Sequence, residues 1–137
     1  VLEGLAARKA AETITVEELE KLDALVKRFE EVGKKGTPQE WIAINSQFHL
    51  IIATVCGNEA LKELLSELQR KIVLSSTLGI GDDYYKSVKE HKDIVDALRA
   101  HDPEEAEHFA RQHVWNTAKR VAALRVGDVR ANDVPRQ

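Results

Sequence analysis

The chain has 137 residues, a length typical of one domain, and 43% of them are hydrophobic while 5% are aromatic. Plentiful Ala, Leu, Glu and Lys beside 7 Gly and 3 Pro favour helices over a sheet. The net charge of −3 excludes a chain-wide basic surface for nucleic acid, and the single cysteine, Cys56, excludes an internal disulfide and fits a reducing, cytoplasmic compartment. Cys56 itself is expected to be a small core residue. No apolar run approaches the roughly 20 residues of a membrane-spanning helix.

The first half of the chain predicts three helices. The first covers about residues 1–12. Thr15 and the acidic residues after it mark the start of the second, whose apolar stripe continues until residues 33–36 (Gly-Lys-Lys-Gly) interrupt it. Residues 37–40 (Thr-Pro-Gln-Glu) form a capping box that opens a third helix reaching about Val55.

The second half predicts three more helices and a tail. The fourth begins at the cap Asn58, ends near residues 79–83, and is expected to turn its apolar residues inward: Leu61, Leu64, Leu65, Leu68, Ile72 and Val73. The fifth spans about residues 83–100, and a second capping box (Asp-Pro-Glu-Glu) opens a sixth that begins near 103 and ends near Leu124. Residues 125–137 form a polar tail that is expected to be frayed or disordered.

Short connections between long amphipathic helices predict that neighbours pack antiparallel. No segment shows the sustained period-two pattern of a strand. The expected fold is therefore an all-α, antiparallel bundle of about six helices over residues 1–124.

Three of the five histidines, His49, His91 and His113, fall on the apolar faces of three different predicted helices. An unpaired buried imidazole costs roughly 1–3 kcal/mol. Each ring could have its own partner, as a single core histidine usually has. Alternatively, the three could share a metal ion, with Asn45, one turn before His49, as a fourth ligand. The other two histidines, His101 and His108, are expected to be solvated at the surface.

Imidazole ligands suit zinc, nickel, copper or iron, and the second nitrogen of each ring needs an outer partner, for which Glu90, Asp93 and Thr117 are candidates. Three nitrogens and one amide oxygen leave open positions for metal-bound water or for a small chelating anion. No carboxylate is adjacent to His49 in the sequence, and Glu90 projects about 100° away from His91. Anion binding is therefore favoured over a helical metalloenzyme that activates water. A metal-free helical dimerisation module is a third alternative, which metal analysis of the purified protein distinguishes.

Several stretches carry a further signal in their order and spacing: Leu2-Glu3-Gly4-Leu5 through Ala11, Asn45-Ser46-Gln47-Phe48-His49, Gly57-Asn58-x-x-Leu61, Glu90-His91-x-x-Ile94 through Leu98, and Asp102-Pro103-x-x-Ala106 through His113. From residue 1 to about 124, the chain resembles the C-terminal effector-binding domain of bacterial GntR-type transcription regulators of the FadR subfamily, the FCD domain.

The resemblance implies a bundle that holds a divalent metal, zinc or nickel in particular, on one Asp and three His. These positions map onto Asn45, His49, His91 and His113. It also implies a small carboxylate or hydroxy-acid effector on the open face of the metal and a homodimer. Operator DNA would be bound by an N-terminal winged helix-turn-helix that is absent from this chain. One branch of the family binds an acyl-CoA without metal, and the intact histidine set argues against that branch here.

Asn45 departs from the family pattern because its amide brings no negative charge. We therefore expect weaker metal binding than with aspartate, and positive coupling between metal and anionic effector. The effector would favour one arrangement of the bundle and thereby change operator affinity. Candidate anion-holding residues lie on and just after the fourth helix, although a solvated face or a helix end explains them equally: Arg70, Lys71, Ser75, Ser76 and Thr77.

Overall fold

The structure is a computed structural model, and it describes residues 1–75 and 84–132. Within these ranges it contains six helices and no strands: α1 (Leu2–Thr13), α2 (Val16–Lys35), α3 (Pro38–Val55), α4 (Glu59–Ser75), α5 (Tyr84–Arg99) and α6 (Pro103–Asn132). The predicted all-α bundle is confirmed.

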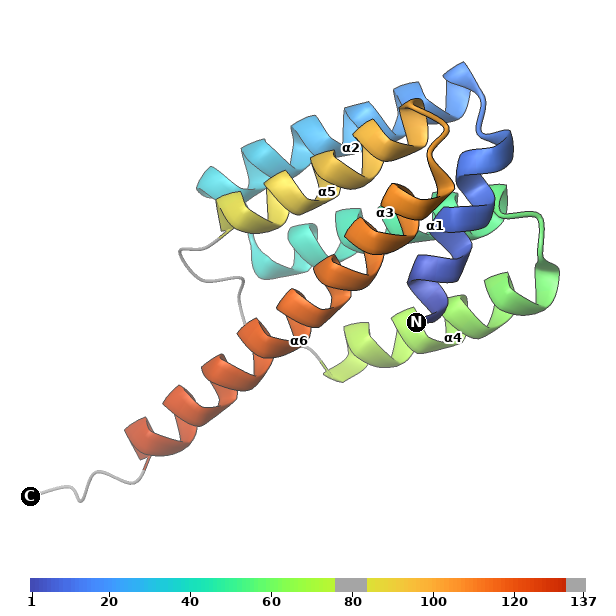
Figure 1. Cartoon of the computed structure of the whole chain (residues 1–137). Coiled ribbons are helices and arrows are strands. Elements are labelled where there is room, and N and C mark those ends of the chain that lie inside the picture. The colour runs from blue at the N-terminus through green and yellow to red at the C-terminus, as the bar shows by residue number, and fades with distance from the viewer. Residues whose placement is uncertain (76–83, 133–137) are drawn as a thin grey trace, which may run out of the picture.

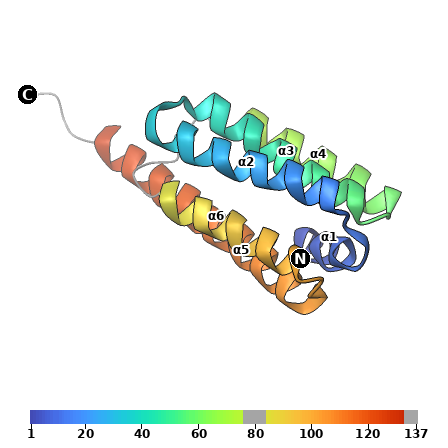
Figure 2. The ribbon, with the colours of Figure 1, turned by 90° about the horizontal axis from the view of Figure 1, so that it is seen from above.

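Two antiparallel hairpins, α2–α3 and α5–α6, form most of the bundle (Figure 1). Seen from above, α2, α3 and α4 lie on one side and α1, α5 and α6 on the other (Figure 2). α1 contacts both sides, because it packs on α6 and α5 and also on α3 and α4. The last turns of α6 extend beyond the other helices.

The predicted capping residues set the starts of the helices. The backbone N–H of Thr15 donates to Glu18 at 2.9 Å, and the N–H of Thr37 donates to Glu40 at 2.7 Å, in two complete capping boxes. The side chain of Asn58 accepts from the N–H of Leu61 at 3.0 Å, as expected of a residue that caps α4.

The core lies between the two sides of the bundle and is centred on Phe29. Its ring lies 4.7 Å from that of Trp41, 6.2 Å from that of Phe48 and 4.2 Å from that of His91, measured between centroids. Cys56 is buried beside this core, and its predicted role as a small core residue is confirmed. No helix in the described ranges has the length and apolar character that crossing a membrane requires.

One predicted helix end is confirmed and another is wrong. α2 ends at Lys35, with Gly36 as its C-cap, inside the stop predicted at residues 33–36. The ring of Tyr84 occupies the place of a Cβ at Gly33. This glycine therefore makes room for the start of α5 and does not end α2. α6 runs to Asn132, well past Leu124, because residues 125–132 contain no proline and are compatible with a helix. The division into a domain ending near 124 and a tail stays a prediction.

The prediction that α4 turns a broad apolar face inward is also wrong. Leu61 and Leu65 are buried, whereas Leu64 and Leu68 are 47% and 40% exposed. Among the described elements α4 contacts only α3 and α1. One apolar residue per turn is enough to cover this small contact, so the other leucines stay exposed. The side chains of residues 72 and 73 lie outside the described part.

Candidate metal centre

Three histidines from three helices meet inside the bundle. His49 on α3, His91 on α5 and His113 on α6 are 5%, 0% and 3% exposed. Their nearest ligand atoms all lie within 4.8 Å of one another. The ring centroids of His91 and His113 are 4.3 Å apart, and those of His49 and His113 are 5.3 Å apart. The three rings could therefore hold a metal ion, as the sequence predicted.

Nδ1 of each of the three rings faces an acceptor outside the cluster, and in His91 and His113 it forms a hydrogen bond. His49 Nδ1 lies 3.2 Å from a carboxylate oxygen of Glu3, and His113 Nδ1 lies 2.9 Å from one of Glu90. His91 Nδ1 lies 2.7 Å from the backbone carbonyl of Ser87, one turn earlier on α5. With the proton on Nδ1, the Nε2 atom of each neutral ring keeps its lone pair for another partner. Histidine ligands of metals are fixed in this way by outer acceptors.

Asn45 adds an oxygen to the same cluster. Its Oδ1 lies 3.0 Å from His91 Nε2. Because Nδ1 of His91 carries the proton, its Nε2 lone pair faces the side-chain amide of Asn45. With Oδ1 toward the ring, a cation satisfies both acceptors, whereas an amide turned by 180° would donate its N–H to Nε2. The donor set of three imidazoles and one amide oxygen therefore fits zinc or nickel.

Burial and mutual repulsion keep two of the rings neutral. Burial lowers the pKa of His91 well below its usual value, and the neighbouring His113 and His49 lower it further. Burial also lowers the pKa of His113, although the hydrogen bond to Glu90 opposes that effect. A neutral imidazole is the form that binds a metal.

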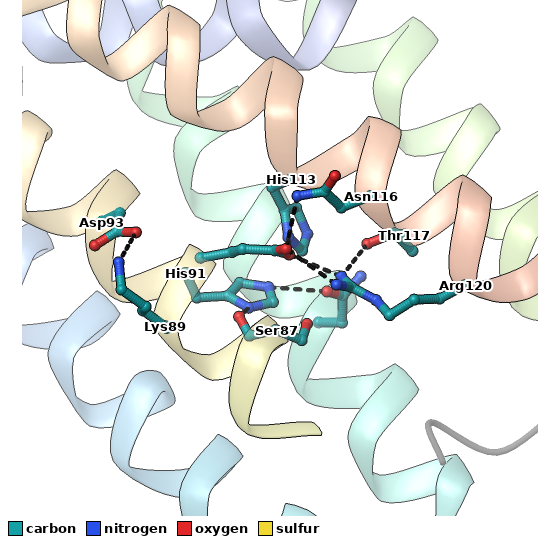
Figure 3. Close-up of polar contacts among 10 residues, drawn as sticks. Ser87, Lys89, His91, Asp93, His113, Asn116, Thr117 and Arg120 are labelled. Atoms are coloured by element: carbon teal, nitrogen blue, oxygen red, sulfur yellow. Dashed lines mark hydrogen bonds and ion pairs between the residues drawn. The ribbon is translucent and has the colours of Figure 1, made fainter. Parts of the chain in front are cut away.

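A polar network on the side of α6 positions His113 (Figure 3). Glu90 accepts from His113, from Asn116 at 2.9 Å, and from Arg120 at 3.0 and 2.7 Å. Burial alone would raise the pKa of Glu90, but these hydrogen bonds and the charge of Arg120 outweigh it and lower the pKa to about 2. Glu90 is therefore ionised and fully engaged.

Glu3 plays the matching role for His49. Burial raises the pKa of this carboxyl, but the attraction of His49 and hydrogen bonds from His49 and Gln69 lower it overall. Gln69 Nε2, on α4, donates to Glu3 at 2.9 Å. The first turn of α1 is thereby connected to both α3 and α4 at the histidine cluster.

The predicted outer partners are only partly correct. Glu90 does hold a ring nitrogen, but that of His113 and not of its neighbour His91. Asp93 instead pairs with Lys89 at 2.6 Å, away from the rings, and Thr117 Oγ1 accepts from Arg120 at 3.1 Å (Figure 3). Glu3, Ser87 and Arg120 were not predicted. A carbonyl four residues before a helical histidine could have indicated Ser87, whereas Glu3 reaches the site through tertiary packing.

The remaining histidines are exposed, as expected. His101 has a positive φ of 50° at the end of α5, and its Nδ1 donates to the carbonyl of Ala11 at 2.8 Å. Among residues that the structure describes, His108 contributes nothing to the buried cluster.

A cavity of about 600 Å³ opens onto Asn45, His49 and His113. A second, of about 540 Å³, lies between α3 and α4 and shares His49, Leu65 and Gln69 with the first. The candidate Arg70 lines this second cavity and pairs with Glu67, while Lys71 pairs with Glu67 from the exposed face of α4. Ser75 is the last residue of α4, and Ser76 and Thr77 lie outside the described residues.

Comparison with known proteins gives one consistent picture. Residues 1–116 match the family described as the FCD domain. Over 114 residues the chain is 30% identical to a Paenarthrobacter nicotinovorans protein named "Probable D-xylose utilization operon transcriptional repressor", covering 82% of this chain and 50% of that protein. The chain thus spans about half the length of this curated relative.

Two solved structures resemble the bundle. Streptococcus agalactiae GntR is 26% identical with a TM-score of 0.75, over 85% of this chain and 53% of that one. E. coli McbR/YncC is 22% identical with a TM-score of 0.77, over 89% of this chain and 63% of that one. Because the sequence identity to E. coli McbR/YncC is only 22%, this similarity shows a shared fold and nothing more.

Proposed function

The chain belongs to the FCD domain family found in GntR-type transcription regulators, and from this premise we propose that it is the effector-sensing domain of such a regulator. In this proposal, Asn45, His49, His91 and His113 hold a divalent metal, zinc or nickel. A small carboxylate or hydroxy acid binds the open face of that metal. DNA recognition belongs to a part of the cytoplasmic, dimeric regulator that this chain does not include.

One observation carries the proposal: all three Nδ1 atoms lie within 3.2 Å of acceptors around the cluster. The three remaining lone pairs, together with the amide oxygen of Asn45, are left to one shared partner. When bound, a divalent metal would supply the positive charge that attracts an effector carboxylate. The protein's own residues fix the ring orientations and exclude water from the far side of each ring.

The position of the site suggests how a ligand could change the whole domain. Glu3 connects α1 to His49 on α3 and to Gln69 on α4, while Glu90 connects α5 to His113 on α6. An anion placed among these elements would favour one arrangement of the bundle over another. Such a shift in population, passed on through α1 or through dimer contacts, would alter operator affinity.

The enzyme alternative fits the site less well. A water-activating centre needs a carboxylate near the metal that is free to accept a proton. The two carboxylates beside the rings, Glu3 and Glu90, both have lowered pKa values and are hydrogen-bonded to the rings. They position histidines and are poorly suited to proton transfer.

Calorimetric titration tests the proposal. Chelator-treated protein should bind one zinc or nickel ion per chain, and the metal-loaded protein should bind a carboxylate that the stripped protein does not. Absence of stoichiometric metal binding would favour the metal-free dimerisation module. Hydrolysis of an ester or phosphate by the loaded protein would favour the enzyme.

A further inference from the structure

The cavity above Asn45, His49 and His113 has mainly apolar walls. They are built from α1, α4 and α6 by Leu2, Leu65, Leu68, Val114 and Val121. Its volume of about 600 Å³ falls within the range of about 300–1,000 Å³ that is usual for sites of drug-sized ligands. The cavity therefore accommodates a ligand with a substantial body beyond the group that meets the metal.

Apart from the proposed metal ligands, two polar side chains of this cavity and the carboxylate of Glu3 already have hydrogen-bond partners. Glu3 accepts from Gln69, and both side chains are thereby engaged beside His49. Thr117 Oγ1 accepts from Arg120. A ligand with several hydroxyl groups would lose its water partners and find few replacements among the described residues, which is unfavourable.

Charge points the same way. Apart from the histidines, Glu3 is the only described side chain lining this cavity that is charged at neutral pH, and its charge is negative. The guanidinium of Arg120 is held by both oxygens of Glu90, and that of Arg70, which lines the adjoining cavity, is paired with Glu67. A second carboxylate on the ligand would be repelled by the carboxylate of Glu3 in the cavity wall. No Lys or Arg among the described residues lines this cavity to offset that repulsion.

We infer that the effector is a monocarboxylate with an apolar body, and not a sugar acid or a polycarboxylate. The inference rests on the proposed function and names the substrate class of that site. The single carboxylate lies toward Asn45, His49 and His113, and the apolar body lies along Leu65 and Val121. The adjoining cavity beyond Leu65 gives longer or branched bodies further room.

Titration of the zinc-loaded protein with matched acids tests the inference. Hexanoate, adipate and gluconate have the same chain length, but adipate carries a second carboxylate and gluconate carries hydroxyls. We expect the dissociation constant to fall on the order of 100-fold from acetate to hexanoate, since each buried methylene contributes about fourfold. Hexanoate should bind at least about tenfold more tightly than adipate or gluconate.

Binding of gluconate or adipate as tight as that of hexanoate overturns the inference but leaves the proposed function intact. If zinc binds and none of the acids does, the carboxylate-sensing function fails as well. Metal-free protein tested with hexanoate separates binding at the site from nonspecific hydrophobic adsorption, and equal affinity with and without zinc would also contradict the inference.

A variant of the wall provides an independent test. Val121→Asn should weaken hexanoate binding about tenfold and leave acetate binding unchanged, because acetate does not reach the wall. Val126→Asn, one and a half turns further along α6 at an exposed position, is the matched control and should change neither. Equal hexanoate affinity in the two variants would overturn the placement of the apolar body.

Discussion

Glu90 is the residue whose replacement tests the outer part of the candidate metal site most sharply. It accepts four hydrogen bonds, one from His113, one from Asn116 and two from Arg120. Glu90→Gln keeps the shape of the side chain but removes its charge and leaves one oxygen to accept. The new amide nitrogen must then face a donor, either the ring of His113 or the guanidinium of Arg120.

This substitution should weaken zinc binding without removing a ligand. Loss of an outer partner of a metal-bound histidine typically costs about 10–100-fold in metal affinity. That factor corresponds to roughly 1.4–2.8 kcal/mol. The reason is that the His113 ring loses both its fixed orientation and the negative charge that increases its basicity.

Asp93→Asn is the matched control, because Asp93 lies on the same helix and pairs with Lys89 at 2.6 Å without touching a histidine (Figure 3). Competition with a chelating dye at neutral pH measures both affinities, and circular dichroism checks that both proteins are folded. If Glu90→Gln binds zinc as tightly as Asp93→Asn, the assignment of Glu90 as a positioning residue is refuted.

Three further predictions concern charge, pH and packing. Asn45→Asp should raise zinc affinity in the absence of an anion and reduce the gain that an anion brings, as measured by titration with and without hexanoate. The free energy of unfolding of metal-free protein should fall as the pH drops below about 6.5, because His91 and His113, with lowered pKa values in the fold, take up protons first in the unfolded chain. Phe29→Ala should lower the free energy of unfolding by about 3–5 kcal/mol in chemical denaturation, since the buried ring contacts Trp41 and His91.

Each of these has a contradicting result. Equal zinc affinities of wild type and Asn45→Asp under all conditions would remove the charge argument. Metal-free unfolding that is independent of pH between neutral and mildly acid conditions would show that the two rings titrate alike in both states. For Phe29, the exposed Val126→Ala is the control, and a similar small loss in both variants would show that the core has been misplaced.

Local signals in the sequence were sufficient to predict the starts of the helices and the three histidine rings that meet in the bundle. Thr15 and Thr37 can cap a helix whatever surrounds it, so their positions alone were informative. His49, His91 and His113 were conspicuous because each interrupts an apolar face at helical spacing. That the three faces meet at one point follows from the bundle architecture.

Features that depend on how two helices cross could not be predicted from local sequence patterns. Gly33 has the local character of a helix end, yet the ring of Tyr84 needs the space that a side chain would fill. Leu64 and Leu68 have the same spacing as their buried neighbours, but α4 meets only α3 and α1. Glu3 reaches His49 because α1 crosses α3 close by, which no local pattern in the first turn of α1 indicates.

X-ray absorption at the metal edge, on protein loaded with one equivalent of zinc, tests the central claim most directly. We predict a first shell of nitrogen and oxygen atoms at about 2.0–2.1 Å with the scattering pattern of three imidazoles. In His91→Ala, that pattern should decrease to two imidazoles. A shell without imidazole, or one unchanged by this substitution, would contradict the claim that His49, His91 and His113 share one metal ion.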